Sequence, residues 1–391
     1  MIDPTPHLER FESYERACRE FRWQIPDQFN IASAISRRHK DAITCVALGD
    51  VRPGGINTYT IGGIDFLSDK FANLLARSGV RQGDAVAVIA SQSAALLVAQ
   101  FGILKLGAAV APLSPSLPSS TLKRALKECD ARAIVSEDAS AETLFINACG
   151  ERTDFWREVN RASSDFTAAE THSSSPAFIF FSGLTGIIHS HASLIGQLTA
   201  FEMFNEFSLS DGSVFWAAGD WVSPQILLGL IYPALWYGCS ITCSNESELL
   251  DSITQCEVTN AFIWSAEKNL MKRIQTAPHE FGTTLNAAYG TIETGLIAAS
   301  CNRWFESDVE TCVRAAPGHS IEILNEQGRI GVRRDDPALF LGYLNDSEKT
   351  GSAFAGDWLV TGDEGKKNED GDLCVSPSTK HLEDSHYNVE N

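Results

Sequence analysis

Positive charge is scarce in this 391-residue chain. Its 31 Lys and Arg residues stand against 50 Asp and Glu residues, which gives a formal net charge of −19. A surplus of that sign repels nucleic-acid phosphates and anionic lipid, so we expect neither nucleic-acid nor membrane-surface binding. The shortage is sharpest between Ala162 and Glu267, where no Lys or Arg occurs. That stretch nevertheless holds eleven acidic residues: Asp165, Glu170, Glu202, Glu206, Asp211, Asp220, Glu246, Glu248, Asp251, Glu257 and Glu267.

Signals for secretion, metal binding and membrane insertion are also absent. The N-terminal residues are too charged for a signal peptide, and no two cysteines have CxxC spacing. The ten cysteines are scattered, so we expect reduced, mostly buried thiols in a cytoplasmic protein. The one long uncharged stretch, Trp221 to Asn245, is interrupted by proline and glycine. It favours a buried helix followed by a buried strand over a membrane span.

From about residue 60 onward, apolar runs of strand length alternate with stretches of helical period. Such alternation with short turns is typical of βαβ units and a parallel sheet. The expected strands are Asp84–Ala90, Ala108–Leu113, Ala131–Ser136, Pro176–Phe181, Ser213–Ala217, Ser240–Cys243 and Asn260–Trp264. The expected helices are Ala94–Lys105, Leu117–Cys129, His191–Glu206, Pro224–Tyr237 and Ser247–Cys256.

The predicted fold class is α/β, with two βαβ (Rossmann-like) lobes of mostly parallel sheets and a small antiparallel β-barrel or sheet. The first lobe is expected over residues 1–175 and the second over 176–310. Short strands with glycine turns predict the β subdomain over 311–374, and the polar residues 375–391 predict a disordered tail. Residues 150–175 are polar and rich in Ser, Thr and Ala, which indicates a surface connector.

The first candidate site is a Ser-Gly-Leu-Thr-Gly turn directly after an apolar strand. Two glycines allow backbone N–H groups to converge on an anion, and the hydroxyls of Ser182 and Thr185 add donors. No GK[ST] follows, so the turn is not a Walker loop. An ordinary turn without a ligand accounts for the same residues.

Two acidic motifs follow further along the chain. Glu293 lies between hydroxyl residues in the stretch Tyr289 to Thr294, where a carboxylate can hold Mg²⁺ against phosphate oxygens. Asp363 follows a glycine in the stretch Gly356 to Asp363, where it could accept two hydrogen bonds from a ribose diol. An exposed helix-start glutamate and a hairpin with solvated charges remain open as alternatives.

Taken in this order and spacing, the three motifs resemble the adenylate-forming superfamily, which includes acyl-CoA synthetases, luciferases and peptide-synthetase adenylation domains. The resemblance extends from about Thr60 to Gly371 and is strongest to short- and medium-chain acyl-CoA synthetases. It implies that a carboxylic acid and ATP, with Mg²⁺, form an acyl-adenylate and that the acyl group then passes to coenzyme A. The substrates would be a small carboxylic acid and a nucleotide.

The resemblance also assigns roles to individual residues. Ser182, Gly183, Thr185 and Gly186 would line the ATP phosphates, and Glu293 would bind Mg²⁺. Tyr289 would lie near the adenine and Asp363 would bind the ribose. Thr294 would contact the α-phosphate, His191 would lie near the acyl pocket, and Trp221 would form part of the pocket wall. A solvent-facing His191 and a core Trp221 remain the alternatives.

Several family features are missing from this sequence. In the family, the phosphate loop continues with a lysine, but here Gly186 is followed at once by Ile187. The segment between Trp264 and Tyr289 is too short for the family's adenine-side motif, and the chain ends where the family continues into a lysine-bearing C-terminal domain. A cation about 4 Å from a phosphate is worth roughly 4 kcal/mol at an effective dielectric near 20, so we expect adenylation to be impaired.

Three functional hypotheses follow from these matches and departures. The chain is a degenerate acyl-CoA synthetase with weak or absent adenylation, or an active enzyme whose C-terminal domain is supplied by a separate protein. Alternatively, it is a non-catalytic nucleotide- or partner-binding module. AMP should then bind better than ATP, because it carries less phosphate charge.

Overall fold

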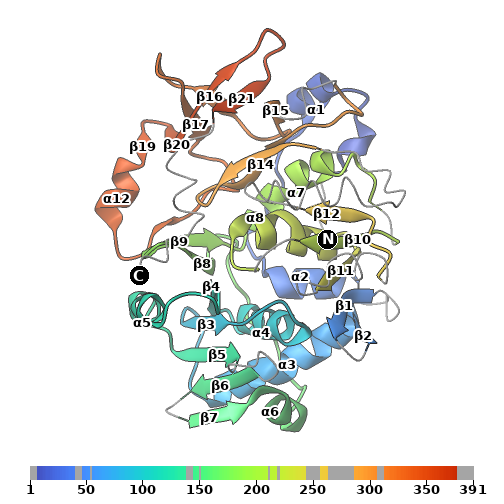
Figure 1. The fold of residues 1–391 in the computed structure, drawn as a ribbon, viewed down its shortest axis with the longest axis vertical. Helices are drawn as coiled ribbons and strands as arrows, with labels where there is room; N and C mark the ends of the chain where they lie inside the picture. Colours follow the sequence, from blue (N-terminus) through green and yellow to red (C-terminus); the bar gives the residue numbers. More distant parts are fainter. Residues whose placement is uncertain are drawn as a thin grey trace.

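The strands of the described residues form three sheets (Figure 1). The structure is a computed structural model, and it describes residues 7–39, 46–52, 55–137, 144–148, 151–209, 212–217, 221–243, 256–262, 286–305 and 312–376. Helical segments lie against the first two sheets, and the third sheet is formed by the chain beyond residue 286. No helix in the described ranges is long and apolar enough to cross a bilayer.

The first sheet has eight strands in the order β18-β9-β8-β4-β3-β5-β6-β7. Its strands are β3 (Ala85–Ile89), β4 (Ala109–Leu113), β5 (Ala133–Glu137), β6 (Leu144–Ala148), β7 (Glu151–Asp154), β8 (Pro176–Ser182), β9 (Thr185–Ser190) and β18 (Gly342–Tyr343). The central strands β8, β4, β3 and β5 run parallel, as the βαβ pattern predicts. The outer strands are antiparallel, so the sheet is mixed.

The second sheet has five strands in the order β12-β10-β11-β1-β2. They are β1 (Val46–Arg52), β2 (Gly55–Thr60), β10 (Val214–Ala217), β11 (Ser240–Cys243) and β12 (Asn260–Phe262). The pairs β1–β11, β10–β11 and β10–β12 are parallel, and β1–β2 is an antiparallel hairpin. The expected helix Ser247–Cys256 lies, except for its last residue, outside the described residues, as do the last two residues of the strand expected to end at Trp264.

The third sheet is antiparallel and open. Its strands follow the order β13-β14-β15-β21-β20-β17-β16, with β19 beside β20. They are β13 (Ala288–Thr291), β14 (Gly295–Ala299), β15 (Cys312–Ala315), β16 (Ile321–Ile323), β17 (Arg329–Arg333), β19 (Phe354–Ala355), β20 (Trp358–Lys367) and β21 (Leu373–Ser376). The short strands expected after residue 310 are therefore confirmed, and they form a sheet that does not close into a barrel.

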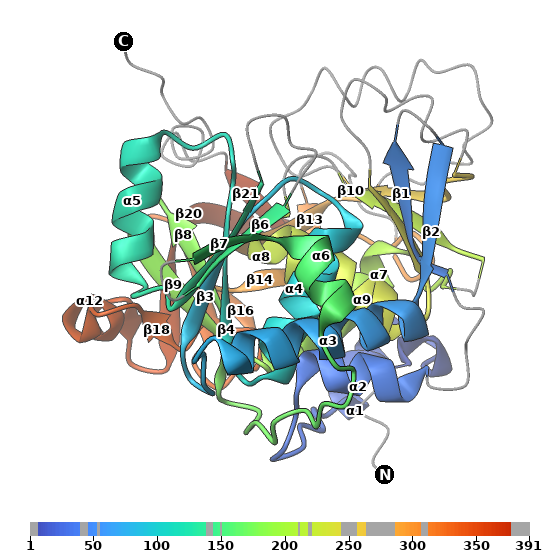
Figure 2. The same cartoon turned by 90° about the horizontal axis from the view of Figure 1, so that it is seen from below.

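The helices pack mainly between and against the first two sheets (Figures 1 and 2). They are η1 (Leu8–Arg10), α1 (Tyr14–Glu20), α2 (Ile31–Arg38), α3 (Ile61–Arg77), α4 (Ala94–Lys105), α5 (Ser119–Glu128), α6 (Phe155–Arg161), α7 (Ser193–Phe204), α8 (Pro224–Ile226), η2 (Leu227–Ile231), α9 (Tyr232–Trp236) and α12 (Ser347–Ser352). Every residue of α4 is buried, and its apolar side chains join both sheets in one core. The largely apolar composition of α4 explains this central position, because a helix whose only polar side chains are Gln100 and Lys105 has no polar face for water.

The sheets do not follow the predicted lobe boundaries. Strands β8 and β9 lie after residue 175, yet they pair with strands of the first lobe. Hairpin β1–β2 lies before residue 175, yet β1 pairs with β11. A boundary chosen from sequence order cannot detect such exchange, because sheet neighbours need not be sequence neighbours.

The expectation of a surface connector over residues 150–175 is wrong for its first part. That part forms β7 and α6, and Phe155 and Val159 of α6 are fully buried. The Asp154 carboxylate accepts a hydrogen bond from the Arg157 amide and begins the helix. The i, i+4 spacing of Phe155 and Val159 after an N-cap residue was the overlooked signal.

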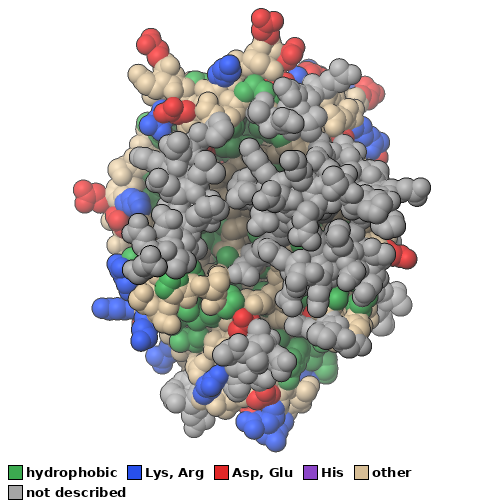
Figure 3. Space-filling view, viewed as in Figure 1, with side chains coloured by type: hydrophobic (Ala, Val, Ile, Leu, Met, Phe, Trp, Pro, Cys, Tyr) green, Lys and Arg blue, Asp and Glu red, His purple; other side chains and the backbone are tan. Residues whose placement is uncertain are grey.

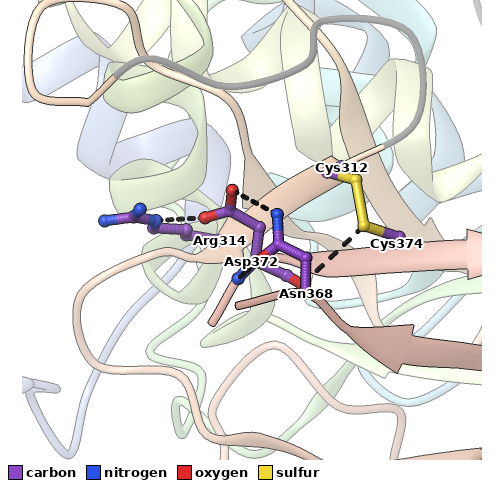
Figure 4. Close-up of a disulfide and its surroundings, with 5 residues drawn as sticks. All are labelled: Cys312, Arg314, Asn368, Asp372 and Cys374. Carbon is purple, nitrogen blue, oxygen red and sulfur yellow. Dashed lines mark hydrogen bonds and ion pairs between the residues drawn. A yellow bond between two sulfur atoms is a disulfide. The ribbon is translucent and has the colours of Figure 1, made fainter. Parts of the chain in front are cut away.

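The expectation that all cysteines are reduced is also wrong. Cys312 on β15 and Cys374 on β21 are paired across two antiparallel strands with 4.2 Å between their Cα atoms, and they form a disulfide (Figure 4). Next to it the Arg314 guanidinium forms an ion pair with Asp372, whose carboxylate also accepts a hydrogen bond from the side chain of Asn368. Sixty-two residues separate the two cysteines in sequence, so spacing gave no indication of the pair. Among the free cysteines of the described ranges, most are buried, as expected.

Candidate nucleotide site

The Ser-Gly-Leu-Thr-Gly turn is a tight hairpin between β8 and β9. Ser182 and Thr185 pair across the two strands, so only Gly183 and Leu184 form the turn. Gly183 has φ of +58°, as the first central residue of a type II′ hairpin requires. Gly186 is buried against Leu344, and a Cβ at this glycine would come within 2.8 Å of the leucine side chain. Gly183 is exposed and both hydroxyl residues are half-buried, so the tip of the hairpin faces solvent.

Glu293 is held by hydroxyl groups on both sides. It lies in the turn between β13 and β14, where the Thr291 hydroxyl donates to its carboxylate at 2.9 Å. The Tyr343 hydroxyl donates to its other carboxylate oxygen at 3.0 Å. Burial raises the pKa of Tyr343, and the charge of Glu293 raises it further, so the phenol stays protonated as a donor. The structure therefore does not support the alternative of an exposed helix-start glutamate.

Tyr289 and Asp363 are brought together from two strands of the antiparallel sheet. The Tyr289 hydroxyl is 3.2 Å from a carboxylate oxygen of Asp363 and 3.3 Å from the Thr361 hydroxyl. Along β20 the residues Leu359, Thr361 and Asp363 are buried in alternation, so the aspartate lies on the inward face of its strand. Burial raises the pKa of Tyr289, and the neighbouring Asp363 adds to the effect. A carboxylate on an inward face favours a binding role over a solvated turn charge.

A lysine from outside the predicted motifs links the hairpin to the glutamate. The ammonium of Lys349 on α12 donates to the Thr185 hydroxyl at 3.1 Å. It also lies 4.5 Å from the centroid of the Tyr343 ring, whose hydroxyl bonds Glu293. A cation therefore lies beside this hairpin, although the family's lysine within the loop itself is missing. The count of Lys and Arg between Ala162 and Glu267 does not include Lys349, because this lysine lies 164 positions after Thr185 in sequence.

The two residues predicted for catalysis are both fully buried. Thr294 has no exposed surface; its hydroxyl accepts a hydrogen bond from the Thr291 amide and donates to the Gly295 carbonyl. His191 also has no exposed surface, and its Nδ1 accepts a hydrogen bond from the Ile31 amide. Burial lowers the pKa of His191 to about 4, so the imidazole is neutral at neutral pH. The solvent-facing alternative for His191 is excluded, and a catalytic role for either residue stays a prediction.

Trp221 is part of the largest hydrophobic core. Its side chain is fully buried among residues that join the two α/β sheets. Its indole nitrogen has no hydrogen-bond partner among the described residues. The position fits a core tryptophan, and the predicted place in a substrate pocket wall remains a prediction.

The acidic stretch does not carry its full formal charge. Glu202 of α7 is buried and accepts hydrogen bonds from the Leu8 amide and the Tyr237 hydroxyl. Burial raises the pKa of its carboxyl to about 8, although both donors act in the opposite direction. Glu202 is therefore mostly neutral at pH 7. Glu206 accepts hydrogen bonds from the Asn302 and Arg303 amides, so it anchors another loop.

We expect the Glu202→Gln variant to be more stable than the parent protein at alkaline pH. Between about pH 4.5 and 8 the folded protein holds a proton that the unfolded chain releases, so stability falls as pH rises through this range. Glutamine removes that penalty, which predicts a gain of about 2–4 kcal/mol at pH 8.5 and little change at pH 4.5. Urea unfolding at both pH values measures it, with the exposed Glu170→Gln as control. An equal difference at both pH values would contradict the burial argument.

Glu293 is the residue that could hold a metal ion. No cluster of three His, Cys, Asp or Glu side chains with metal-ligating geometry occurs within the described ranges. Mg²⁺ is commonly bound by one or two carboxylates together with substrate phosphates, so a single carboxylate could hold this ion if the hairpin binds phosphate as predicted. Tyr343, whose hydroxyl bonds Glu293, borders an open groove of about 460 Å³. The groove is lined by Ile188, Leu341, Gly342, Tyr343, Asn345, Asp346, Ser347 and Thr350. The Tyr343 side of the Tyr343–Glu293 pair is therefore open to solvent.

Curated relatives resemble most of the chain at low identity. An uncharacterized acyl-CoA ligase, YtcI, of Bacillus subtilis is 21% identical over 404 residues, which cover 88% of this chain and 76% of that protein. The mitochondrial acyl-coenzyme A synthetase ACSM3 of Rattus norvegicus is 22% identical over 435 residues, covering 93% and 74%. The nonribosomal peptide synthetase otaB of Aspergillus niger is 26% identical over 394 residues, and the chain spans only 20% of its length.

Solved structures share the fold. An acyl-CoA synthetase of Brucella canis superposes with a TM-score of 0.80 at 18% identity, covering 94% of this chain and 80% of that one. The anthranilate CoA ligase AuaEII in complex with anthranoyl-AMP gives a TM-score of 0.76 at 18% identity, covering 90% and 77%. The expected α/β fold of the acyl-CoA synthetases is thus confirmed. The model of the AMP-binding enzyme family matches residues 33–266, more than half of the sequence, and the chain belongs to this family.

Proposed function

We propose that this chain binds an adenine nucleotide and activates a small carboxylic acid as its acyl-adenylate, for transfer to coenzyme A. The observation that carries the proposal is a series of three contacts. Lys349 bonds Thr185 and lies over the Tyr343 ring, and the Tyr343 hydroxyl bonds Glu293. This series joins the hairpin predicted to bind phosphate to the carboxylate predicted to bind Mg²⁺.

Each residue of the predicted nucleotide site has a role in this proposal. Asp363 accepts hydrogen bonds from the ribose hydroxyls, and the Tyr289 hydroxyl holds the carboxylate in place. Mg²⁺ on Glu293 would neutralise charge on the phosphate oxygens. The hydroxyls of Ser182 and Thr185 donate to those oxygens at the exposed tip of the hairpin.

Adenylation should be slower than in family members that have a lysine within the phosphate loop. The two-residue turn leaves few backbone amides at the tip, because Ser182 and Thr185 pair with each other. The resemblance to the family implies that thiol transfer also uses the family's C-terminal domain. If a separate protein supplies that domain, adding it should raise thioester formation.

A non-catalytic nucleotide-binding module is the second candidate. The complete burial of Thr294 and His191 favours it, because a buried side chain cannot contact a substrate without rearrangement. Both candidates require the same nucleotide site. They differ in whether an acid is activated.

Calorimetry and isotope exchange separate the two candidates. We expect AMP and ATP to bind the purified protein, and acid-dependent exchange of pyrophosphate into ATP to occur with acids between acetate and decanoate. AMP binding without exchange for any acid would leave only the binding module. The absence of binding by either nucleotide would overturn both.

A further inference from the structure

We propose that Lys349 supplies the positive charge beside the β8–β9 hairpin. Its ammonium group contacts the β- and γ-phosphates of a bound nucleotide or free pyrophosphate. This inference rests on the proposed nucleotide site and adds one residue to it. Lys349 lies outside the predicted motifs. It belongs to α12, and its ammonium group donates a hydrogen bond to the Thr185 hydroxyl.

Three contacts position Lys349, two of them through its ammonium group. The Asp346 carboxylate accepts a hydrogen bond from the Lys349 amide and thereby sets the start of α12. The ammonium lies over the Tyr343 ring, and its donor bond to Thr185 points it at the hairpin. A lysine ammonium has three donors and one is used here, so donors remain for phosphate oxygens.

The backbone brings α12 and the hairpin together independently of that lysine. Strand β18 pairs with β9, and the Leu344 amide donates to the Gly186 carbonyl at 2.8 Å. A Cβ at Gly186 would clash with Leu344, so this close approach depends on glycine at that position. The segment that carries Lys349 is thus packed directly on the strand that follows the hairpin.

The surroundings add positive charge to the same side of the molecule. The side chain of Asn345 donates to the carbonyl of Glu128, which joins the segment before α12 to the C-terminal end of α5. Helix α5 contains Lys123, Arg124 and Lys127, and Figure 3 shows Lys and Arg side chains gathered over this edge of the molecule. Glu128 of α5 and Asp346 and Glu348 at the start of α12 oppose these charges, so the assignment depends on the contacts of Lys349 itself.

Titration with sodium pyrophosphate, without added metal, tests the proposal in four proteins. We expect Lys349→Met to weaken pyrophosphate binding by about tenfold or more, since one close cation is lost. Lys349→Arg should stay within about threefold of the parent protein, because it keeps the charge. Lys366→Met removes one exposed charge on β20 and should change affinity by less than about twofold. AMP affinity, measured in parallel, should stay within about threefold in all variants, since AMP lacks the two outer phosphates.

Pyrophosphate affinity that is unchanged in Lys349→Met would overturn the assignment, as would a parent protein that binds no pyrophosphate. AMP binding reports separately on the nucleoside end. A parent protein that binds AMP but not pyrophosphate therefore removes the role of Lys349 and keeps the nucleotide site. One that binds pyrophosphate through Lys349 but not AMP supports the anion site and removes the nucleotide assignment.

Discussion

Replacing Asp363 with alanine is expected to weaken AMP binding by about a hundredfold or more. A ribose diol on a buried carboxylate makes two charge-assisted hydrogen bonds, each worth about 1.5–3 kcal/mol. The substitution removes both and leaves the buried Tyr289 hydroxyl without its carboxylate partner. Calorimetric titration of AMP into the variant measures the loss.

Two matched variants separate binding from folding in this experiment. Asp357→Ala removes the same charge from the exposed turn before β20 and should leave AMP affinity unchanged. Tyr289→Phe keeps the ring but removes the hydroxyl that positions Asp363, so a smaller loss of about three- to tenfold is expected. An Asp363→Ala protein that is folded and binds AMP within about twofold of the parent would exclude the ribose assignment.

Replacing Gly290 with alanine should cost more than about 3 kcal/mol of stability or prevent folding. A Cβ at this position would lie 1.6 Å from the carbonyl oxygen of Gly295 on the paired strand. The register shifts between Tyr289 and Gly290, so the backbones approach unusually closely at this bulge. Opening the bulge would also displace the turn that holds Glu293.

Chemical denaturation of Gly290→Ala measures this cost, and Gly62→Ala is its control. Gly62 lies in the first turn of α3, where a Cβ would meet no described atom within 4 Å, so alanine there should be neutral or stabilising by up to about 1 kcal/mol. A Gly290→Ala protein with the parent's denaturation midpoint would show that the strand pair tolerates a wider spacing. The close approach would then not be required for the site.

The elements with well-bounded apolar runs could be predicted from the sequence almost to the residue. Helix α4 spans Ala94–Lys105 as expected, because its apolar run is long and begins after the N-cap residue Ser93. Strands β3, β4, β8 and β11 agree within one or two residues, since each is a short apolar run between turns. The expected helix Pro224–Tyr237 is present as α8, η2 and α9 in succession.

Pairings between distant segments could not be predicted in the same way. Neither the Cys312–Cys374 disulfide nor the contact of Lys349 with Thr185 leaves a local pattern in the sequence. The charge argument from the sequence is incomplete for the same reason. Counting charges along Ala162 to Glu267 assumes that sequence neighbours surround the hairpin, whereas a lysine from α12 reaches it in space and the buried Glu202 is mostly neutral.

Part of the candidate site was nevertheless visible in the sequence. The motifs indicate Tyr289, Glu293 and Asp363, and the structure connects the tyrosine with the aspartate by a hydrogen bond. The burial of Thr294 and His191 was not visible, because their neighbours come from other elements such as α2. Motif order therefore indicates which residues lie together better than it indicates their accessibility.

The hairpin, Glu293 and the Tyr289–Asp363 pair are proposed to form one nucleotide site that Lys349 completes. A crystal structure of the protein with a non-hydrolysable ATP analogue tests this central claim most directly. We expect the ribose hydroxyls on the Asp363 carboxylate and the outer phosphates between Thr185 and the Lys349 ammonium. An analogue bound at another place, or with its phosphates directed away from the hairpin, would contradict it.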